Sequence, residues 1–201
     1  MGAGGALGGA VKGMLPAGLR AWLREWRADR RTTRSPDRAV LEGRVLPAFA
    51  ALGGSVLWVG CRRYTRHYPA MLEARGATCH TLEIDPAAAR WGRSGRHVVG
   101  SLLEVDRLYP AGSFDAVLCN GVLGFGVNEP AAQAQAFAAM ARILKPQGWL
   151  LLGWNTDRIE DPLATGLALR QFAPARLADL DRRIAVDGCT HVFDFLRRLP
   201  S

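Results

Sequence analysis

The chain has 201 residues, of which 49% are hydrophobic, and 26 basic against 18 acidic side chains give it a formal net charge of +8. This length is typical of one domain with a sizeable core. No apolar run reaches the roughly 18 residues that a membrane-spanning helix requires, so no membrane span is expected.

The cysteines and the N-terminus bear on the compartment. Cys61, Cys79, Cys119 and Cys189 are scattered singly and form neither a CxxC pair nor a Cys/His cluster. This spacing favours reduced thiols over disulfides or a metal site. The N-terminus also lacks the charged and apolar segments of a signal peptide. We therefore expect a cytoplasmic protein without a bound metal.

The positive charge is concentrated near the N-terminus, where residues 1–50 carry nine basic and four acidic side chains. A nucleic-acid partner is left open by this excess. It is not favoured, because the basic residues do not alternate with aromatic ones as in known RNA-binding modules. A solvated basic face explains the same residues.

Residues 1–15 are interpreted as a flexible arm, and 17–31 as a helix with a Trp/Leu stripe. A second helix is predicted to begin after Asp37 and to bend at Pro47. Residues 16–52 would then form N-terminal helices that either pack on the following domain or cover its cleft as a lid.

From Gly53 onward, short apolar runs alternate with helical segments. Helices are predicted at 68–76, after Pro86, at 129–145 and within 161–172. Strands are predicted at 55–60, 77–85, 97–100, 114–121 and 149–155, followed by a closing pair in 182–198. Uniformly apolar strands separated by helices are typical of parallel sheets. Residues 53–201 are therefore predicted to form a Rossmann-like, doubly wound α/β domain. Its seven-stranded sheet would be mostly parallel, with an antiparallel hairpin at the C-terminal edge.

Ligands of such sheets bind beyond the carboxyl ends of the strands. The residues at these ends are Gly60, Cys61, Arg62 and Tyr64 after the first strand, Glu83, Ile84 and Asp85 after the second, Ser101 and Leu102 after the third, Asn120 after the fourth and Asn155 after the fifth. A carboxylate that closes the second strand can accept both hydroxyls of a ribose. Asp85, just before Pro86, is placed to cap the next helix, so Glu83 is the expected ribose ligand.

Four stretches in this order resemble motifs of the class I S-adenosylmethionine-dependent methyltransferases. VLWVGC (56–61) resembles the first motif, commonly VLDVGCGTG, and LEID (82–85) resembles the acidic end of the second strand. FDAVLCNGVLGF (114–125) and ARILKPQGWLLLGW (141–154) resemble the fourth and fifth strands. The resemblance covers about residues 53–155. It implies the Rossmann-like fold, S-adenosylmethionine (SAM) as cofactor and methyl transfer as activity.

The sequence departs from the family pattern in the cofactor loop and near it. Trp58 stands in place of an acidic residue, Arg62, Arg63 and Tyr64 in place of later loop residues, Ser101 in place of an adenine-binding aspartate, and Gln147 in place of a glycine. One of the two arginines could pair with the methionine carboxylate of the cofactor. Tyr64 could lay its ring near the sulfonium.

The candidate catalytic residues near the transferred methyl group are Tyr64, His67, Asn120 and Asn155. His67 is the best general base, since imidazole titrates near neutrality, although an exposed or capping histidine on the first helix explains it at least as well. The two asparagines could instead satisfy turn backbone groups. The remaining histidines, His80, His97 and His191, are interpreted as structural.

Methyl transfer to a small-molecule acceptor is the leading functional hypothesis. With so little beyond the core fold, such an enzyme would use its N-terminal helices as a lid or form a homodimer to complete its pocket. A catalytically silent scaffold protein is the main alternative, because of the altered loop. An RNA methyltransferase is the third. A nicotinamide-dependent oxidoreductase is weakest, because GCRRYT does not supply a GxGxxG turn.

Overall fold

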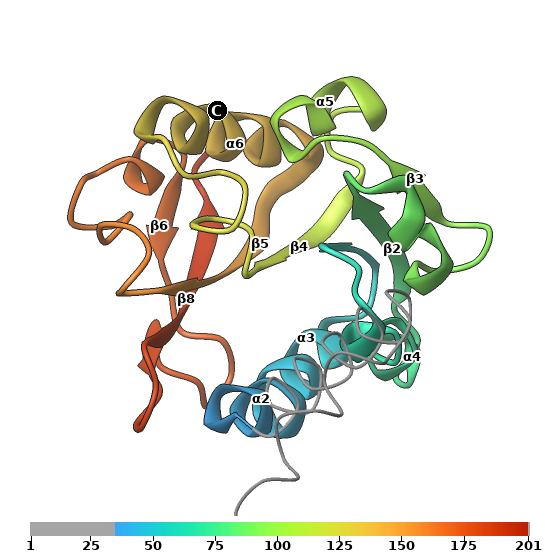
Figure 1. Ribbon diagram of the computed structural model, residues 1–201, viewed down its shortest axis with the longest axis horizontal. Coiled ribbons are helices and arrows are strands. Elements are labelled where there is room, and N and C mark those ends of the chain that lie inside the picture. The colour runs from blue at the N-terminus through green and yellow to red at the C-terminus, as the bar shows by residue number, and fades with distance from the viewer. Residues whose placement is uncertain (1–34, 201) are drawn as a thin grey trace, which may run out of the picture.

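The computed structural model describes residues 35–200, in which eight strands form one mixed sheet. The strand order is β3-β2-β1-β4-β5-β8-β6, and β7 also pairs with β8 (Figure 1). The strands are β1 (Ser55–Val59), β2 (Thr78–Glu83), β3 (His97–Val99), β4 (Phe114–Asn120), β5 (Leu144–Asn155), β6 (Phe172–Pro174), β7 (Arg183–Ala185) and β8 (His191–Arg198). The predicted arm (1–15) and first helix (17–31) lie outside the described residues.

The five strands from β1 through β5 pair with one another in parallel, and β8 pairs with β5 in the antiparallel sense. The predicted Rossmann-like sheet with an antiparallel C-terminal part is therefore confirmed. Its outermost position is shared by two short strands, since β6 pairs with the end of β8 and β7 with its beginning. Counted by position, the sheet is the expected seven strands wide.

Helices cover both faces of the sheet. The α-helices are α2 (Pro36–Val40), α3 (Leu46–Leu52), α4 (Tyr68–Glu73), α5 (Val105–Leu108) and α6 (Pro130–Ile143). Short 3-10 turns occur at Arg63–Thr65, Pro86–Trp91, Leu102–Glu104 and Ala168–Arg170. The helix predicted within 161–172 is wrong apart from that last turn. Gly166 interrupts it with a φ of +73°, which no regular helix accommodates.

One continuous helical segment precedes β1, and it contains the predicted irregularity before Pro47. Between α2 and α3, residues Leu41–Val45 form a π-helical turn, in which the amide of Leu46 donates to the carbonyl of Leu41. Proline lacks an amide hydrogen and its ring collides with the carbonyl four residues earlier, so a wider turn accommodates it.

The core consists of two apolar layers, one on each face of the sheet. On one face, Leu57 and Val59 of β1 pack with the buried side of α6. On the other, Val56 and Trp58 pack with residues of α3 and α4, including Phe49 and Leu72. Figure 1 shows α5 and α6 on one side of the strands and α2, α3 and α4 on the other. Alternating burial of this kind fixes the register of β1, and with it the position of the loop that follows.

Candidate active site

A pocket lies at the carboxyl ends of β1, β2 and β4. It encloses about 920 Å³, part of which is open to solvent. Eight of the twelve predicted site residues line it: Gly60, Arg62, Tyr64, Glu83, Ile84, Ser101, Leu102 and Asn120. The other four, Cys61, His67, Asp85 and Asn155, lie outside the lining. The position of the pocket follows from the parallel sheet, whose strand ends converge at one edge.

The loop after β1 turns at Gly60, whose φ of +90° favours glycine. Trp58 occupies the position of the missing acidic residue and is fully buried against Tyr68. Its indole nitrogen donates a hydrogen bond of 2.6 Å to the carbonyl oxygen of Gly60. The tryptophan therefore holds the turn from beneath and does not enter the pocket.

Glu83, at the end of β2, is buried with only 4% of its surface exposed. Its Oε2 accepts from the backbone amide of Cys61 at 2.8 Å, and its Oε1 accepts from the amide of Asp85 at 3.0 Å. Asp85 caps the following turn by accepting from the amide of Ala87, which confirms its predicted role. Glu83 is thus an oriented carboxylate that ties the first loop to the second.

Arg62 lies over this carboxylate at the mouth of the pocket. One guanidinium nitrogen is 2.8 Å from Oε2 of Glu83 and 2.9 Å from the carbonyl oxygen of Cys61. The arginine side chain is half exposed, whereas the glutamate side chain is buried. An ion pair with one solvated partner is weak, so a ligand can displace the arginine at modest cost.

The β3 side of the pocket is mainly apolar. Ile84 is 66% exposed even though it lines the pocket, and Leu102 is a buried residue of the same lining. Ser101 caps the turn that follows by accepting from the amide of Leu103. An exposed isoleucine between a carboxylate and a serine fits the flat face of a purine.

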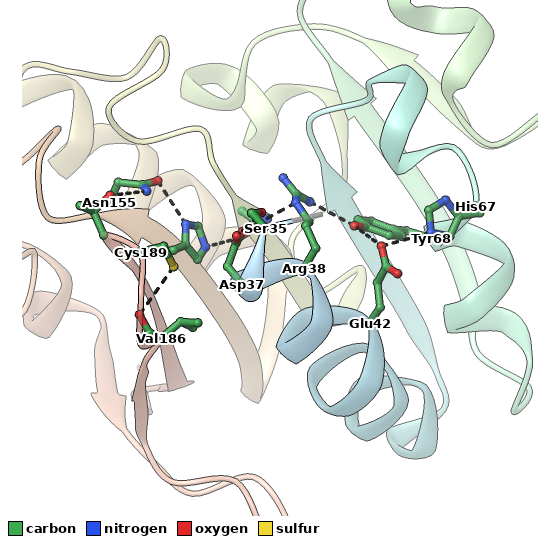
Figure 2. A network of polar contacts seen from close by, with 12 residues as sticks. Ser35, Asp37, Arg38, Glu42, His67, Tyr68, Asn155, Val186 and Cys189 are labelled. Carbon is green, nitrogen blue, oxygen red and sulfur yellow. Dashed lines mark hydrogen bonds and ion pairs between the residues drawn. The ribbon is translucent and has the colours of Figure 1, made fainter. Parts of the chain in front are cut away.

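On its other side the pocket is walled by Arg38 of α2, which the sequence did not indicate. Its guanidinium donates to the hydroxyl of Tyr68 at 3.1 Å and lies 4.9 Å from the centroid of the Tyr64 ring. Burial raises the pKa of Tyr68, so its hydroxyl keeps the proton that it donates to Glu42. In Figure 2, Arg38 lies between Asp37 and Tyr68. The guanidinium therefore takes up one side of Tyr64, the ring expected near the sulfonium.

His67, the expected general base, precedes α4 at its N-cap position without a side-chain capping hydrogen bond, and it lies outside the pocket lining. Its Nε2 is 3.3 Å from a carboxylate oxygen of Glu42, and its ring packs against Tyr68 (Figure 2). The side chain is about half exposed, which agrees with the alternative of an exposed histidine and not with a capping one. We therefore leave it out of the proposed catalytic group.

The β4 side brings together three residues that are far apart in the sequence. The ring nitrogen Nε2 of His191 lies 2.9 Å from Oδ1 of Asn120, and its Nδ1 lies 3.1 Å from Oδ1 of Asn155. His191 was expected to be structural. It is 5% exposed and lies directly behind Asn120. A signal for this cluster was present in Gly153, because glycine inside a strand often marks a close approach of other groups.

Two further properties concern the described part of the chain. Residues 35–200 contain no cluster of histidine, cysteine and acidic side chains that could hold a metal ion. Nor does any helix in that range combine the length and the apolar character needed to cross a membrane.

The lining fits SAM. The carboxylate of Glu83 could accept hydrogen bonds from ribose hydroxyls, and the side chains of Ile84 and Leu102 could pack on an adenine ring. The turn at Gly60 leaves the backbone open to the amino-acid part, since a Cβ there would meet only Val122 at 3.7 Å. When bound, SAM supplies a methyl group on a positively charged sulfur.

Comparisons with known proteins agree with this geometry. Residues 57–152 match a family model described as a methyltransferase domain. No curated protein sequence is significantly similar to the chain.

Among solved structures, a TehB-like SAM-dependent methyltransferase from Corynebacterium glutamicum has a TM-score of 0.65 and 21% identity, covering 92% of this chain and 100% of its own. The N-methyltransferase NodS from Bradyrhizobium japonicum has a TM-score of 0.65 and 14% identity, covering 84% and 99%. The 1,6-didemethyltoxoflavin-N1-methyltransferase of Burkholderia thailandensis, with bound 1,6-didemethyltoxoflavin and S-adenosylhomocysteine, has a TM-score of 0.58 and 20% identity, covering 92% of each chain. Residues 57–152 therefore match a methyltransferase domain, and the described chain has the fold of these SAM-dependent methyltransferases.

Proposed function

We propose that the protein transfers the methyl group of SAM to a small-molecule acceptor. The observation that carries this proposal is the shape of the pocket. Besides the residues suited to the cofactor, its lining includes Asn120, Arg38, Tyr64 and Phe125. A recess to which α2 contributes Arg38 suits a small molecule better than a nucleic-acid strand.

The similar structures support this acceptor class by analogy. One is named as an N-methyltransferase, and another contains the small heterocycle 1,6-didemethyltoxoflavin. The cofactor-binding group in our proposal is Gly60, Glu83, Ile84, Ser101 and Leu102, together with Arg62 as a residue that must move. Asn120 and Tyr64 would face the acceptor.

A silent, non-catalytic protein remains the second candidate, because of the ion pair between Arg62 and Glu83. The arginine satisfies an oxygen that a ribose hydroxyl would otherwise use. If this ion pair never opened, Glu83 could not bind the ribose of the cofactor. RNA methylation is the third candidate; the basic N-terminal residues that prompted it fall largely outside the described range. The cytoplasmic location and the homodimer stay predictions from the sequence.

Titration calorimetry of the purified chain with SAM and with S-adenosylhomocysteine tests the proposal first. Micromolar binding of both, followed by transfer of a labelled methyl group to members of a small-molecule library, is the expected result. A folded chain that binds neither compound would establish the silent protein instead. Retention on RNA that weakens steeply with salt, with methyl label incorporated into the RNA, would favour the third candidate.

A further inference from the structure

A chain of hydrogen bonds runs from the surface to the acceptor side of the pocket. The hydroxyl of Thr190 donates to a carboxylate oxygen of Asp157 at 2.7 Å and accepts from Nδ2 of Asn155 at 2.9 Å. The carbonyl oxygen of Asn155 lies 3.1 Å from Nδ1 of His191. On the far side of the ring, Nε2 is 2.9 Å from the side-chain amide of Asn120.

The polarity of this chain is set at its outer end. A carboxylate only accepts hydrogen bonds, so the single hydroxyl proton of Thr190 is used on Asp157. The oxygen of Thr190 must then accept, which turns the amide nitrogen of Asn155 toward it. The carbonyl oxygen of Asn155 consequently faces the imidazole, and Nδ1 of His191 must carry a proton.

The orientation of the Asn120 amide, at the inner end of the chain, depends on which ring nitrogen of a neutral His191 carries its single proton. Burial lowers the pKa of His191 to about 4, so the ring is neutral at pH 7. With its proton on Nδ1, the ring offers Nε2 as an acceptor and needs a donor from Asn120. The two ends of an amide have nearly the same shape, and the hydrogen-bond network decides between them. The network therefore assigns the Asn120 amide the other way round from the Oδ1 placement described above, with its nitrogen facing His191 and its carbonyl oxygen facing the pocket.

Gly153 shows that the fold makes room for this contact. It lies opposite Asn120 in the pairing of β4 with β5. A Cβ at this position would come within 1.7 Å of the side-chain amide of Asn120 and 3.0 Å of Nε2 of His191. Any other residue would push the amide off the ring, so glycine is required by the contact and not by its backbone angles.

Asn120 belongs to the acceptor half of the pocket by the order of the strands. Glu83 and Ser101 follow β2 and β3, on one side of β1, whereas Asn120 ends β4 on the other side. The adenosine seat and Asn120 are thus separated by the glycine loop. Phe125 and Arg38 are also part of the lining.

We propose that His191 is a positioning residue that holds the carbonyl oxygen of Asn120 toward the acceptor, and that the acceptor is an amine whose N–H donates to this oxygen. The proposal rests on the proposed methyl transfer and names its substrate class. A hydroxyl acceptor would need a base for its proton. The titratable residues among the described lining are Arg38, Arg62, Tyr64 and Glu83, of which the glutamate lies at the ribose seat.

A neutral amine needs no base before it reacts. Its lone pair forms the new N–C bond while the electron pair of the S–C bond goes to sulfur, leaving S-adenosylhomocysteine. The proton on nitrogen is then released to water. The oxygen of Asn120 orients the N–H, which aims the lone pair, and such orientation is a large part of the catalysis of a displacement.

The first test is the tautomer of His191, which does not depend on any cofactor. Long-range proton–nitrogen NMR of histidine-labelled protein at pH 7, with His191→Gln to assign the signals, is expected to show a proton on Nδ1 and none on Nε2. A proton on Nε2, whether in the other tautomer or in the imidazolium, would point the amide nitrogen of Asn120 into the pocket and overturn the proposal.

The second test uses sinefungin, a SAM analogue that carries a primary amine in place of the S-methyl group. We expect it to bind about tenfold more tightly than S-adenosylhomocysteine, the effect of one hydrogen bond to a charged donor. Asn120→Leu should bring the ratio of the two affinities close to one, and Asn120→Asp should keep or raise it. His191→Phe should lower it, because the amide is no longer held.

His97→Phe is the matched control, since it removes another strand histidine that is outside the lining. It should leave the ratio unchanged. If His191 served the fold alone, His191→Phe would weaken both compounds equally and leave the ratio intact, which would overturn its role. Equal affinities in the unmodified protein would overturn the amine class while the cofactor site stands. Failure of both compounds to bind would overturn the proposed methyl transfer itself, whatever the tautomer.

Discussion

Two buried carboxylates of this protein have an arginine as their partner, but they serve different ends. Asp194, in the middle of β8, is fully buried and accepts from Arg183 at 2.6 Å and 2.9 Å and from the indole of Trp154 at 2.9 Å. Glu83 is nearly as buried, but its partner Arg62 is half exposed at the edge of the pocket.

The difference lies in what surrounds each arginine. Arg183 is fixed from both sides, because it also donates to both carboxylate oxygens of Asp161 at 2.6 Å and 2.9 Å. Arg62 reaches Glu83 from a loop, with water on its other side. The pair of Arg183 and Asp194 thus stabilises the inside of the sheet, whereas the pair of Arg62 and Glu83 lies at the edge of the pocket, with its arginine half exposed to solvent.

The largest effect is expected from Arg183→Met. The substitution leaves the charge of Asp194 buried with the tryptophan N–H as its remaining donor, and breaking a buried pair in this way costs about 3 kcal/mol or more of unfolding free energy. Urea unfolding measures it. Arg44→Met removes an exposed pair with Asp179 and should cost less than about 1 kcal/mol. Equal losses in the two variants would show that burial does not distinguish them.

Glu83→Gln should weaken the binding of S-adenosylhomocysteine by roughly 10- to 100-fold, since hydrogen bonds to a charged acceptor are lost. The side chain keeps its shape, so the unfolding midpoint should change little. Titration calorimetry provides the measurement. Glu104→Gln, an exposed position outside the lining, is the control. Unchanged affinity in the Glu83 variant would remove this residue from the cofactor seat.

The pH dependence of stability tests the buried arginine network around Arg183. The hydrogen bonds from Arg183 hold the pKa of Asp161 below its usual value. A carboxylate with a depressed pKa adds stability above the pKa of the unfolded chain, about 3.9, and this contribution is lost as the pH falls through the lower folded value. Asp161→Asn should therefore cost about 1 kcal/mol at pH 7 and much less at pH 2. A loss that is independent of pH would contradict the ionic contribution.

The smallest effect is expected from Arg62→Met, and its sign is the informative part. If the arginine only covers Glu83, its removal should tighten the binding of S-adenosylhomocysteine by about two- to fivefold, the value of a half-exposed pair. Weaker binding would mean that Arg62 contacts the carboxylate of the ligand, as the sequence allowed. Arg66→Met, on the exposed side of the same loop, is the matched control.

Much of the fold was predictable because its signals are local. The apolar runs that became β1 and β4 and the long helix α6 are defined by composition and periodicity within a few residues. Asp85 was predicted as a cap for a similar reason, since a carboxylate before a proline acts on its immediate neighbours. The helix predicted within 161–172 failed, since Gly166 outweighed the propensity of the residues around it.

The altered first motif shows where local reasoning ends. Trp58 differs from the acidic residue of the family, and nothing in the sequence shows that its indole supports the turn at Gly60 from below. Gln147 likewise replaces a glycine and keeps the left-handed backbone, with a φ of +60°. Both turns therefore contain a residue with positive φ, Gly60 in the first and Gln147 in the second.

The sequence by itself determined the order of the elements, the edge of the sheet at which ligands bind and the identity of the buried carboxylate at the end of β2. Only the tertiary structure decided which side chains meet there. Arg38 comes from a helix before the first strand, and His191 from the last strand, so their contacts with Tyr64 and Asn120 span long stretches of chain. Periodicity reports the face that a residue buries, but such contacts depend on packing between elements that no local pattern encodes.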